Sequence, residues 1–280
     1  MRNKLIREIS EREKDYIEEL ELYDKVVKVT GLISLNQHDI QTDGRGIRAV
    51  KIFTRQTLIG LSLGKLLPRT DFSEPDDGEL WDVSSIASLS GNMLEGYLSL
   101  YYFGIENISE SEAELRFFIL QLHRNIEWYN IRKYHSPNDP DIEEFEEVIP
   151  EQKNKIRNHP FLSNLTIEQK KKAIQGSEMY KTKADFENEL AICKDLRRDY
   201  RQLSNLVHPL PLSIERIDND RGRGLGSEPD VIYCLICMMI ARRYLAASTI
   251  GIADKFPIEL ANRFSKEIES IRPLENVGFN

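Results

Sequence analysis

The sequence predicts an all-α protein, and two observations lead to this fold class. Apolar residues recur three and four positions apart along most of the 280-residue chain, which is the period of an amphipathic helix. The alternation of apolar and polar residues that indicates a half-buried strand is almost absent. We therefore expect a bundle of about eight helices. No segment of roughly 20 to 50 residues repeats, which argues against a solenoid.

Four helices are expected in the first half of the chain. The first carries a narrow apolar stripe that includes Tyr16 and Tyr23, so it can lie along another helix. Gly31 is expected to end it, and a connector follows at residues 32–46. The expected helices cover residues 6–27, 47–67, 82–105 and 109–134.

Capping residues support the starts of the third and fourth helices. Asp82 or Ser84 can accept a hydrogen bond from the free backbone N–H groups at the start of the third helix. Ser109 is followed three residues later by Glu112, which is the spacing of a capping box.

The second half of the chain begins with a segment of different composition. Residues 135–165 contain four prolines and the acidic run DIEEFEEVIPE, and we interpret this segment as an insertion. Thr166 is then expected to cap a short basic helix, TIEQKKKAIQG. The remaining expected helices are a long one at 183–207, an apolar one from Ser227 or Asp230 to Thr249, and a last one that starts at Pro257.

The domain organisation follows from these elements. We expect residues 1–44 to form an N-terminal helix and connector. Residues 45–280 are expected to form one helical bundle domain that carries the insertion at about 135–165. A hydrophobic content of 40% is sufficient for a core of this size.

Composition argues against several classes of protein. The net charge of −8 is not that of a protein that coats nucleic acid regardless of sequence, although a local basic patch can still bind RNA. Three cysteines give no disulfide framework and suit the reducing cytoplasm. The N-terminus lacks the apolar core of a signal peptide. The most apolar run, 231–241, is too short to span a bilayer, and we expect it in the core or in a subunit interface of a cytoplasmic protein.

The sharpest candidate for a functional site is the stretch RRDYRQLSNLVHPLP, residues 197–211. Arg201 and His208 are seven residues apart, about two helical turns, so both side chains fall on one face. Ser204 lies between them, and Arg197 extends the face by one turn. Pro209 disfavours helical geometry at the preceding residue, so His208 is expected at the helix terminus.

These residue types can act on a phosphodiester. The negative end of the helix dipole favours a protonated imidazole, and histidine transfers protons near neutral pH. A guanidinium nearby can hold a phosphate or stabilise the charge that develops on it. Attack by an RNA 2′-hydroxyl requires such a base and such a cation, but no metal. The alternative, that these side chains only cap carbonyls and pair with surface carboxylates, remains open.

The motif of Arg201, six residues and His208 at the end of a long helix resembles the HEPN (higher eukaryotes and prokaryotes nucleotide-binding) superfamily. The segments SSIASLSGNMLEGYLSLYYFGIE and ELRFFILQLHRNIEWYN, with the late stretch YRQLSNLVHPLPLS, resemble an uncharacterised group of bacterial helical proteins. The two resemblances together cover about 45–134 and 183–250, and only the late stretch is HEPN-like.

The HEPN resemblance implies a dimeric helical bundle that cleaves RNA without a metal or other cofactor, in a toxin–antitoxin or antiviral defence system. It implies that the paired arginine and histidine sites meet across the dimer interface. The loop RGRGLG is by default a flexible loop, although its arginines can also gather RNA. The site would comprise the catalytic Arg201 and His208, the supporting Tyr200, Ser204 and Asn205, and the substrate-binding Arg197, Arg221 and Arg223.

Other patterns favour structural roles. Cys234 and Cys237 form a CxxC inside an apolar helix with no second pair, so we expect core packing and not a metal site. Glu95, a carboxylate in an otherwise apolar helix, is expected to be buried as the partner of an arginine such as Arg116 or Arg55.

The alternative function is a non-catalytic helical module that binds a partner protein or a nucleotide. The acidic segment near 139–151 and the narrow stripe of the first helix favour it. A metal hydrolase is the least favoured function, because no ExxH or HxxxH pair of the usual kind is present.

Overall fold

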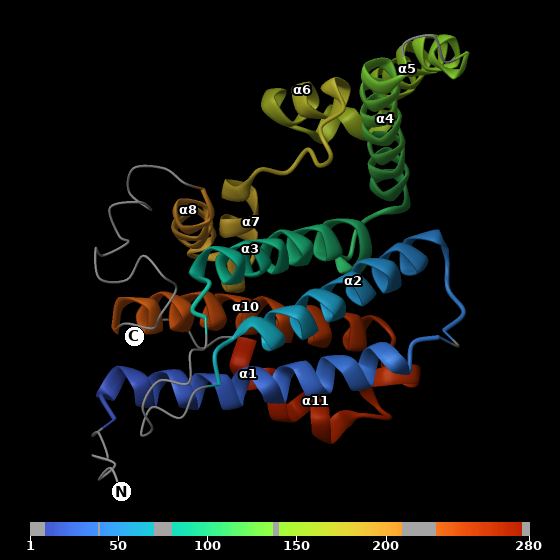
Figure 1. The fold of residues 1–280 in the computed structure, drawn as a ribbon. Helices are drawn as coiled ribbons and strands as arrows, with labels where there is room; N and C mark the ends of the chain where they lie inside the picture. The colour runs from blue at the N-terminus through green and yellow to red at the C-terminus, as the bar shows by residue number, and fades with distance from the viewer. Residues whose placement is uncertain (1–8, 39, 70–79, 137–139, 209–227, 276–280) are drawn as a thin grey trace, which may run out of the picture. The chain divides into compact units, whose positions relative to one another are not determined.

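The fold is all-α, as the sequence predicts (Figure 1). The computed structural model describes residues 9–38, 40–69, 80–136, 140–208 and 228–275. Every regular element in these ranges is helical, and there are more helices than the eight expected. The chain divides into two compact units, Met1–Ile105 with Glu189–Asn280, and Glu106–Asn188.

The first unit contains the longest stretch of buried sequence. Its α-helices are α1 (Glu11–Leu35), α2 (Gly44–Leu66), α3 (Val83–Leu100), α8 (Leu196–Val207), α10 (Glu228–Lys255) and α11 (Ser265–Ile271). Single turns of π- or 3₁₀-helix complete it: η1 (Tyr101–Ile105), η3 (Ala191–Cys193), η4 (Pro257–Ala261) and η5 (Arg272–Glu275).

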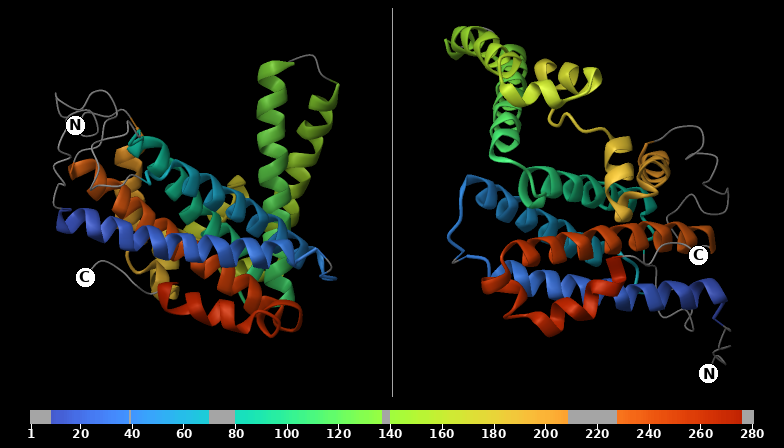
Figure 2. Two further views of the ribbon diagram at one scale, coloured as in Figure 1. Left: turned by 60° about the horizontal axis from the view of Figure 1, so that its bottom comes forward. Right: turned by 180° about the vertical axis from the view of Figure 1, so that it is seen from behind.

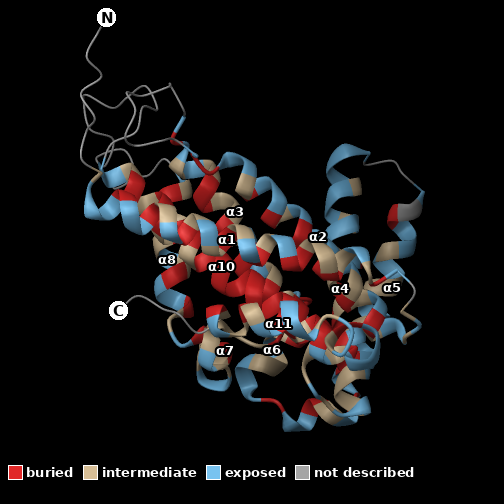
Figure 3. Ribbon diagram, turned by 90° about the horizontal axis from the view of Figure 1, so that it is seen from below, coloured by how far each residue is buried: buried red, intermediate tan, exposed pale blue. Residues whose placement is uncertain are grey.

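Helix α10 forms the centre of this unit. It packs against α1, α2 and α3, and Figure 2 shows it running alongside α1 and α3. Every residue from Ile240 to Ile250 is buried, which Figure 3 shows as a red helix. A helix that is apolar on all sides must be enclosed in this way. In the run 231–241, seven of the eleven residues are buried and the other four are partly buried, so its expected place in the core is confirmed.

By length and composition, α10 is also the one described helix that could cross a membrane. Of its most apolar window, 78% is buried inside the fold. The central helix of a soluble protein is equally long and apolar, so length and composition do not distinguish a membrane-spanning helix from a buried core helix.

Helix α1 runs past the expected stop at Gly31. It begins after Ser10, which forms a capping box with Glu13, and ends at Leu35. Beyond Gly31, Ile33 is completely buried, and just before it the hydroxyl groups of Thr30 and Thr249 lie 2.7 Å apart. The connector is accordingly shorter than the expected 32–46.

The helix starts predicted from local capping residues agree with the structure better than the predicted helix ends do. Asp82, one of the two alternatives, caps α3 by accepting a hydrogen bond from the Ser85 N–H at 3.0 Å. Thr166 caps the short basic helix in a capping box with Gln169. These caps follow from residues three positions apart, so they need no tertiary contact.

The second unit consists of α4 (Glu110–His135), α5 (Asp141–Arg157), the 3₁₀ turn η2 (Pro160–Asn164), α6 (Ile167–Gln175) and α7 (Lys183–Glu189). Helices α4 and α5 form a hairpin (Figure 2). Asn125 donates to Gln152 at 3.2 Å, and Tyr129 donates to Glu146 at 2.9 Å.

The lack of helical periodicity expected for 135–165 is wrong, whereas the interpretation of this segment as an insertion stays a prediction. Residues 141–157 form α5, with Pro150 inside the helix. Ile142 and Ile156 are buried, and Phe145 and Ile149 are partly buried. The helical spacing was present, but the surrounding glutamates and the proline obscured it.

The single helix expected at 183–207 is also wrong. Helix α7 ends at Glu189 and α8 begins at Leu196, with an extended residue, Leu190, between them. This stretch contains neither glycine nor proline. The break instead coincides with the boundary of the two compact units, which local periodicity does not reveal.

Candidate functional site

Helix α8 has one buried face and one exposed face. Leu196, Leu203 and Leu206 are buried, and the helix packs on α3. Arg197 and Arg201 are exposed, as is His208 at the end of the helix. The amphipathic spacing therefore directs the predicted arginines and histidine to the solvent side.

A buried ion pair fixes which face of α8 is exposed. Asp199 lies on the buried side of α8, has no accessible surface, and accepts a hydrogen bond from the Arg243 guanidinium of α10. Burial by itself lowers the pKa of Arg243, because it disfavours the charged form. The favourable interactions with Tyr244 and Asp199 together exceed this effect, so the pKa of Arg243 is raised above its ordinary value. The guanidinium also lies 4.9 Å from the centre of the Tyr244 ring. Because a buried charge requires its partner, this pair restricts rotation of α8 about its axis.

His208 is the C-terminal capping residue of α8, as predicted. Its backbone is extended (φ −87°, ψ 139°), and its N–H donates to the Ser204 carbonyl at 3.3 Å. Because that hydrogen bond has the i to i−4 register of an α-helix, the Cα of His208 stays in phase with the helix. His208 therefore occupies the helical position that continues the face of Arg201.

The predicted supporting residues have specific places at this terminus. The Asn205 amide donates to the carbonyl of Arg201, one turn earlier in α8, at 2.9 Å. Ser84 of α3 donates to the carbonyl of Val207 at 3.1 Å. Tyr200 and Ser204 are partly exposed. Asn205 therefore bonds within α8, and the bond that reaches the helix end comes from Ser84 of α3.

Two of the predicted substrate-binding residues are not tested. Arg221 and Arg223 lie outside the described residues, as does Pro209. The structure therefore brings Arg197, Arg201, Ser204 and His208 to one face of α8, and it does not place the loop arginines relative to them.

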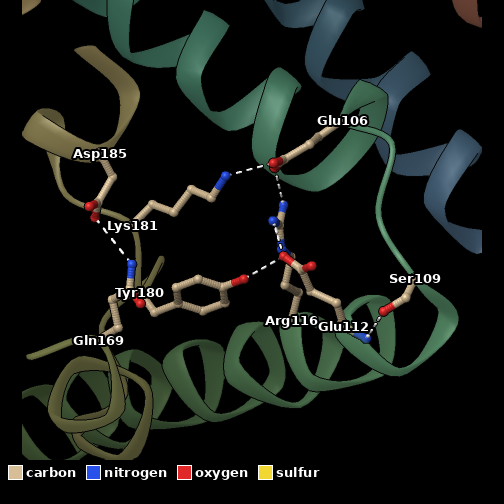
Figure 4. Close-up of polar contacts among 8 residues, drawn as sticks. All are labelled: Glu106, Ser109, Glu112, Arg116, Gln169, Tyr180, Lys181 and Asp185. Carbon is tan, nitrogen blue, oxygen red and sulfur yellow. Dashed lines mark hydrogen bonds and ion pairs between the residues drawn. The ribbon is translucent and has the colours of Figure 1, made fainter. Parts of the chain in front are cut away.

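A second polar cluster, within the unit Glu106–Asn188, was not predicted (Figure 4). Arg116 is 3% exposed and lies between two carboxylates: it donates to Glu106 at 2.7 Å and to Glu112. Lys181 donates to the other oxygen of Glu106 at 2.6 Å, and Tyr180 donates to Glu112. Burial raises the pKa of Tyr180 above its ordinary value, so its hydroxyl stays protonated and donates.

This cluster balances two cations against two carboxylates, which indicates a structural role. It links the start of α4 to the segment around 180–181, far apart in the sequence. The expected burial of Glu95 as the partner of an arginine such as Arg116 or Arg55 is wrong, because Glu95 is exposed. Arg116 pairs with Glu106 and Glu112 instead. The spacing of Glu112 and Arg116, four residues apart on one helix, was the available sequence signal.

Neither the cysteines nor the carboxylates form a metal site in the part of the chain that the structure describes. No three histidine, cysteine, aspartate or glutamate side chains gather there closely enough to hold an ion. Cys234 and Cys237 are buried in α10, and burial raises the pKa of Cys237 to about 12. Such thiols are unreactive, as expected for core residues.

No relative was found. Comparison with protein-family models, with curated proteins and with solved structures gives no match to this chain. Its function is therefore inferred from the chemistry of its own residues.

Proposed function

We propose that the protein is a metal-independent endoribonuclease of HEPN-like type and that the exposed face of α8 carries its active site. The observation that supports this most is the placement of Arg201 and His208 on one solvent-facing side, at the end of a helix whose opposite side is buried. The setting we propose is bacterial toxin–antitoxin or antiviral defence in the cytoplasm.

The proposed reaction is internal transesterification of RNA. The His208 imidazole takes the proton of a ribose 2′-hydroxyl, the 2′-oxygen forms a bond to the adjacent phosphorus, and the bond from phosphorus to the 5′-oxygen breaks. The leaving 5′-oxygen takes a proton from water. The products are a 2′,3′-cyclic phosphate and a 5′-hydroxyl. Arg201 stabilises the charge on the non-bridging oxygens, and Arg197 binds a neighbouring phosphate.

The test is cleavage of RNA by the purified full-length protein in excess chelator. We expect products ending in a 2′,3′-cyclic phosphate, and no cleavage of an otherwise identical substrate with 2′-deoxyribose at the scissile position. His208→Ala and Arg201→Ala should each reduce the rate by roughly a hundredfold or more.

Matched controls remove the same side chains elsewhere. His135→Ala and Arg263→Ala replace an exposed histidine and an exposed arginine outside the α8 face, and both should cleave at the wild-type rate. Full activity in His208→Ala, or equal loss in the controls, would remove the assignment.

The second candidate is a non-catalytic module that binds a partner. The observation that favours it is a group of exposed apolar side chains on α4, which includes Trp128, Ile131 and Tyr134. Absence of cleavage under all conditions, together with a stoichiometric protein complex, would support this function instead.

A further inference from the structure

Helix α2 has an exposed face that combines apolar side chains with cations. Ile47 is 47% exposed, Leu58 59% and Leu61 43%. A single exposed apolar side chain is common on a protein surface, but several that gather on one face commonly mark an interface. The face is separate from the proposed active site, because it uses no residue of α8.

These residues lie on one side of the helix. At about 100° of rotation per residue, the exposed apolar and charged residues between positions 47 and 65 all lie within about 60° of the direction of Leu58. On the opposite side, Phe53 and Leu63 are buried, where α2 packs on α1, α3 and α10. The exposed set, here called the α2 face, comprises Ile47, Lys51, Arg55, Leu58, Leu61 and Lys65.

All the charges of α2 are positive. The helix contains no aspartate or glutamate, in a chain whose net charge is −8. Lys51 and Arg55 are one turn apart on the same face, where like charges repel each other. Among the described residues, no carboxylate forms an ion pair with Lys51, Arg55 or Lys65. A partner that carries negative charge would therefore relieve this repulsion.

The positions of the cations argue against a lipid surface as the partner. In a helix that lies on a membrane, lysines and arginines occupy the polar side, and the apolar side enters the lipid. In the α2 face, Lys51 and Lys65 lie within about 20° of the direction of Leu58, so they would enter the lipid together with the leucines. This arrangement suits a partner that offers carboxylates next to its apolar side chains.

The apolar residues argue against a nucleic acid as the partner. Proteins bind unpaired bases by stacking them on aromatic rings, and the α2 face has no aromatic side chain. The aliphatic side chains of Leu58 and Leu61 form no favourable contact with phosphate groups. Apolar side chains beside cations suit instead an amphipathic helix that carries glutamate or aspartate.

We propose that the α2 face binds an acidic amphipathic helix of a partner protein. The apolar side chains of the α2 face pack against the apolar side of that helix. Lys51, Arg55 and Lys65 pair with its carboxylates, and such pairs determine which partner binds more than they add affinity. The binding does not depend on the proposed ribonuclease activity.

The experiment measures how a labelled designed peptide binds to the full-length protein, by fluorescence anisotropy. The peptide is about three heptads long, with leucine at the a and d positions and glutamate at the e and g positions. A matched peptide has lysine in place of each glutamate. We expect the wild-type protein to bind the glutamate peptide roughly tenfold more tightly than the lysine peptide, or better.

Charge reversal on the protein should reverse this preference. Lys51→Glu/Lys65→Glu should bind the glutamate peptide roughly tenfold more weakly, and the lysine peptide more tightly, than the wild type does. Leu58→Ser should weaken binding of the glutamate peptide, because it removes apolar contact area. Two controls, Lys155→Glu and Ile258→Ser, change exposed residues outside the α2 face and should bind as the wild type does.

Circular dichroism confirms that each variant is folded, and parallel measurements replace the peptide with vesicles that contain phosphatidylserine and with a single-stranded RNA. Equal affinity of the wild type for the two peptides, or binding of neither, would overturn the proposal. So would an unchanged peptide preference in the double variant, because this result places the binding site elsewhere. If the wild type binds vesicles or RNA in place of the glutamate peptide, and the double variant loses that binding, the proposed partner is wrong.

Discussion

The guanidinium of Arg243 in α10 donates a hydrogen bond to the carboxylate of Asp199 in α8, and both side chains are buried. The two residues are 44 positions apart in the sequence. Asp199 lies between Arg198 and Tyr200 on the same helix as the candidate catalytic residues. The ion pair therefore links the core of the first unit to the orientation of the α8 face.

Removing one partner of this pair should destabilise the protein strongly. We expect Asp199→Asn to lower the free energy of unfolding by about 3 to 5 kcal/mol, because Arg243 stays buried without its counter-charge. Urea denaturation followed by circular dichroism measures the change.

Two further variants test the explanation. Asp195→Asn removes a partly exposed carboxylate that pairs with Arg198, and it should change stability by no more than about 0.5 kcal/mol. Asp199→Leu combined with Arg243→Met should recover most of the lost stability. An Asp199→Asn protein as stable as the wild type would show that the charge pair contributes nothing.

The exposed residues of α8 should behave in the opposite way. Arg201→Ala and His208→Ala should each change stability by less than about 0.5 kcal/mol, because neither side chain is buried. Asn205→Ala should cost about 1 kcal/mol, since it removes the hydrogen bond to the Arg201 carbonyl. Thermal melting curves of the three variants provide the comparison. If His208→Ala unfolds the protein, loss of cleavage in that variant carries no information on catalysis.

The N-terminal cap of α2 should make stability depend on pH in the acid range. A hydrogen bond from the Gly46 N–H, 2.7 Å from the Asp43 carboxylate, lowers the pKa of Asp43 below its ordinary value of 3.8. A lowered folded-state pKa stabilises the protein above the unfolded pKa, and this contribution is lost as the pH falls through the folded pKa. Asp43→Ala should therefore cost about 1 kcal/mol at neutral pH and progressively less below about pH 4.

The control for this prediction is Asp43→Asn, which keeps a capping oxygen but does not ionise. Its stability at neutral pH should be close to that of the wild type. Urea denaturation midpoints at neutral and acid pH separate the three proteins. If Asp43→Ala loses the same free energy of unfolding at every pH, the charge of the Asp43 carboxylate does not stabilise this cap.

The buried cluster at Arg116 should determine the stability of the second unit. Arg116→Met leaves Glu106 and Glu112 without the guanidinium between them, and we expect a loss of about 3 to 5 kcal/mol. Hydrogen exchange should accelerate at the start of α4 and around residues 180–181, which this cluster connects. Lys133→Met removes an exposed cation 3.8 Å from Glu146 and should leave the exchange of these segments unchanged. Equal protection in Arg116→Met and the wild type would rule out the structural role.

The sequence by itself determined the helical class, most helix starts and the common face of Arg201 and His208. Each of these depends on residues within about two turns of one another, and helical periodicity and capping are local properties. The tertiary structure decided the continuation of α1 past Gly31, the break between α7 and α8, and the partners of the buried charges. Arg242 bonds to Glu19, 223 residues away, and Arg243 to Asp199. A buried guanidinium can be satisfied by any carboxylate that the fold brings near it, so its partner is fixed only when the helices pack.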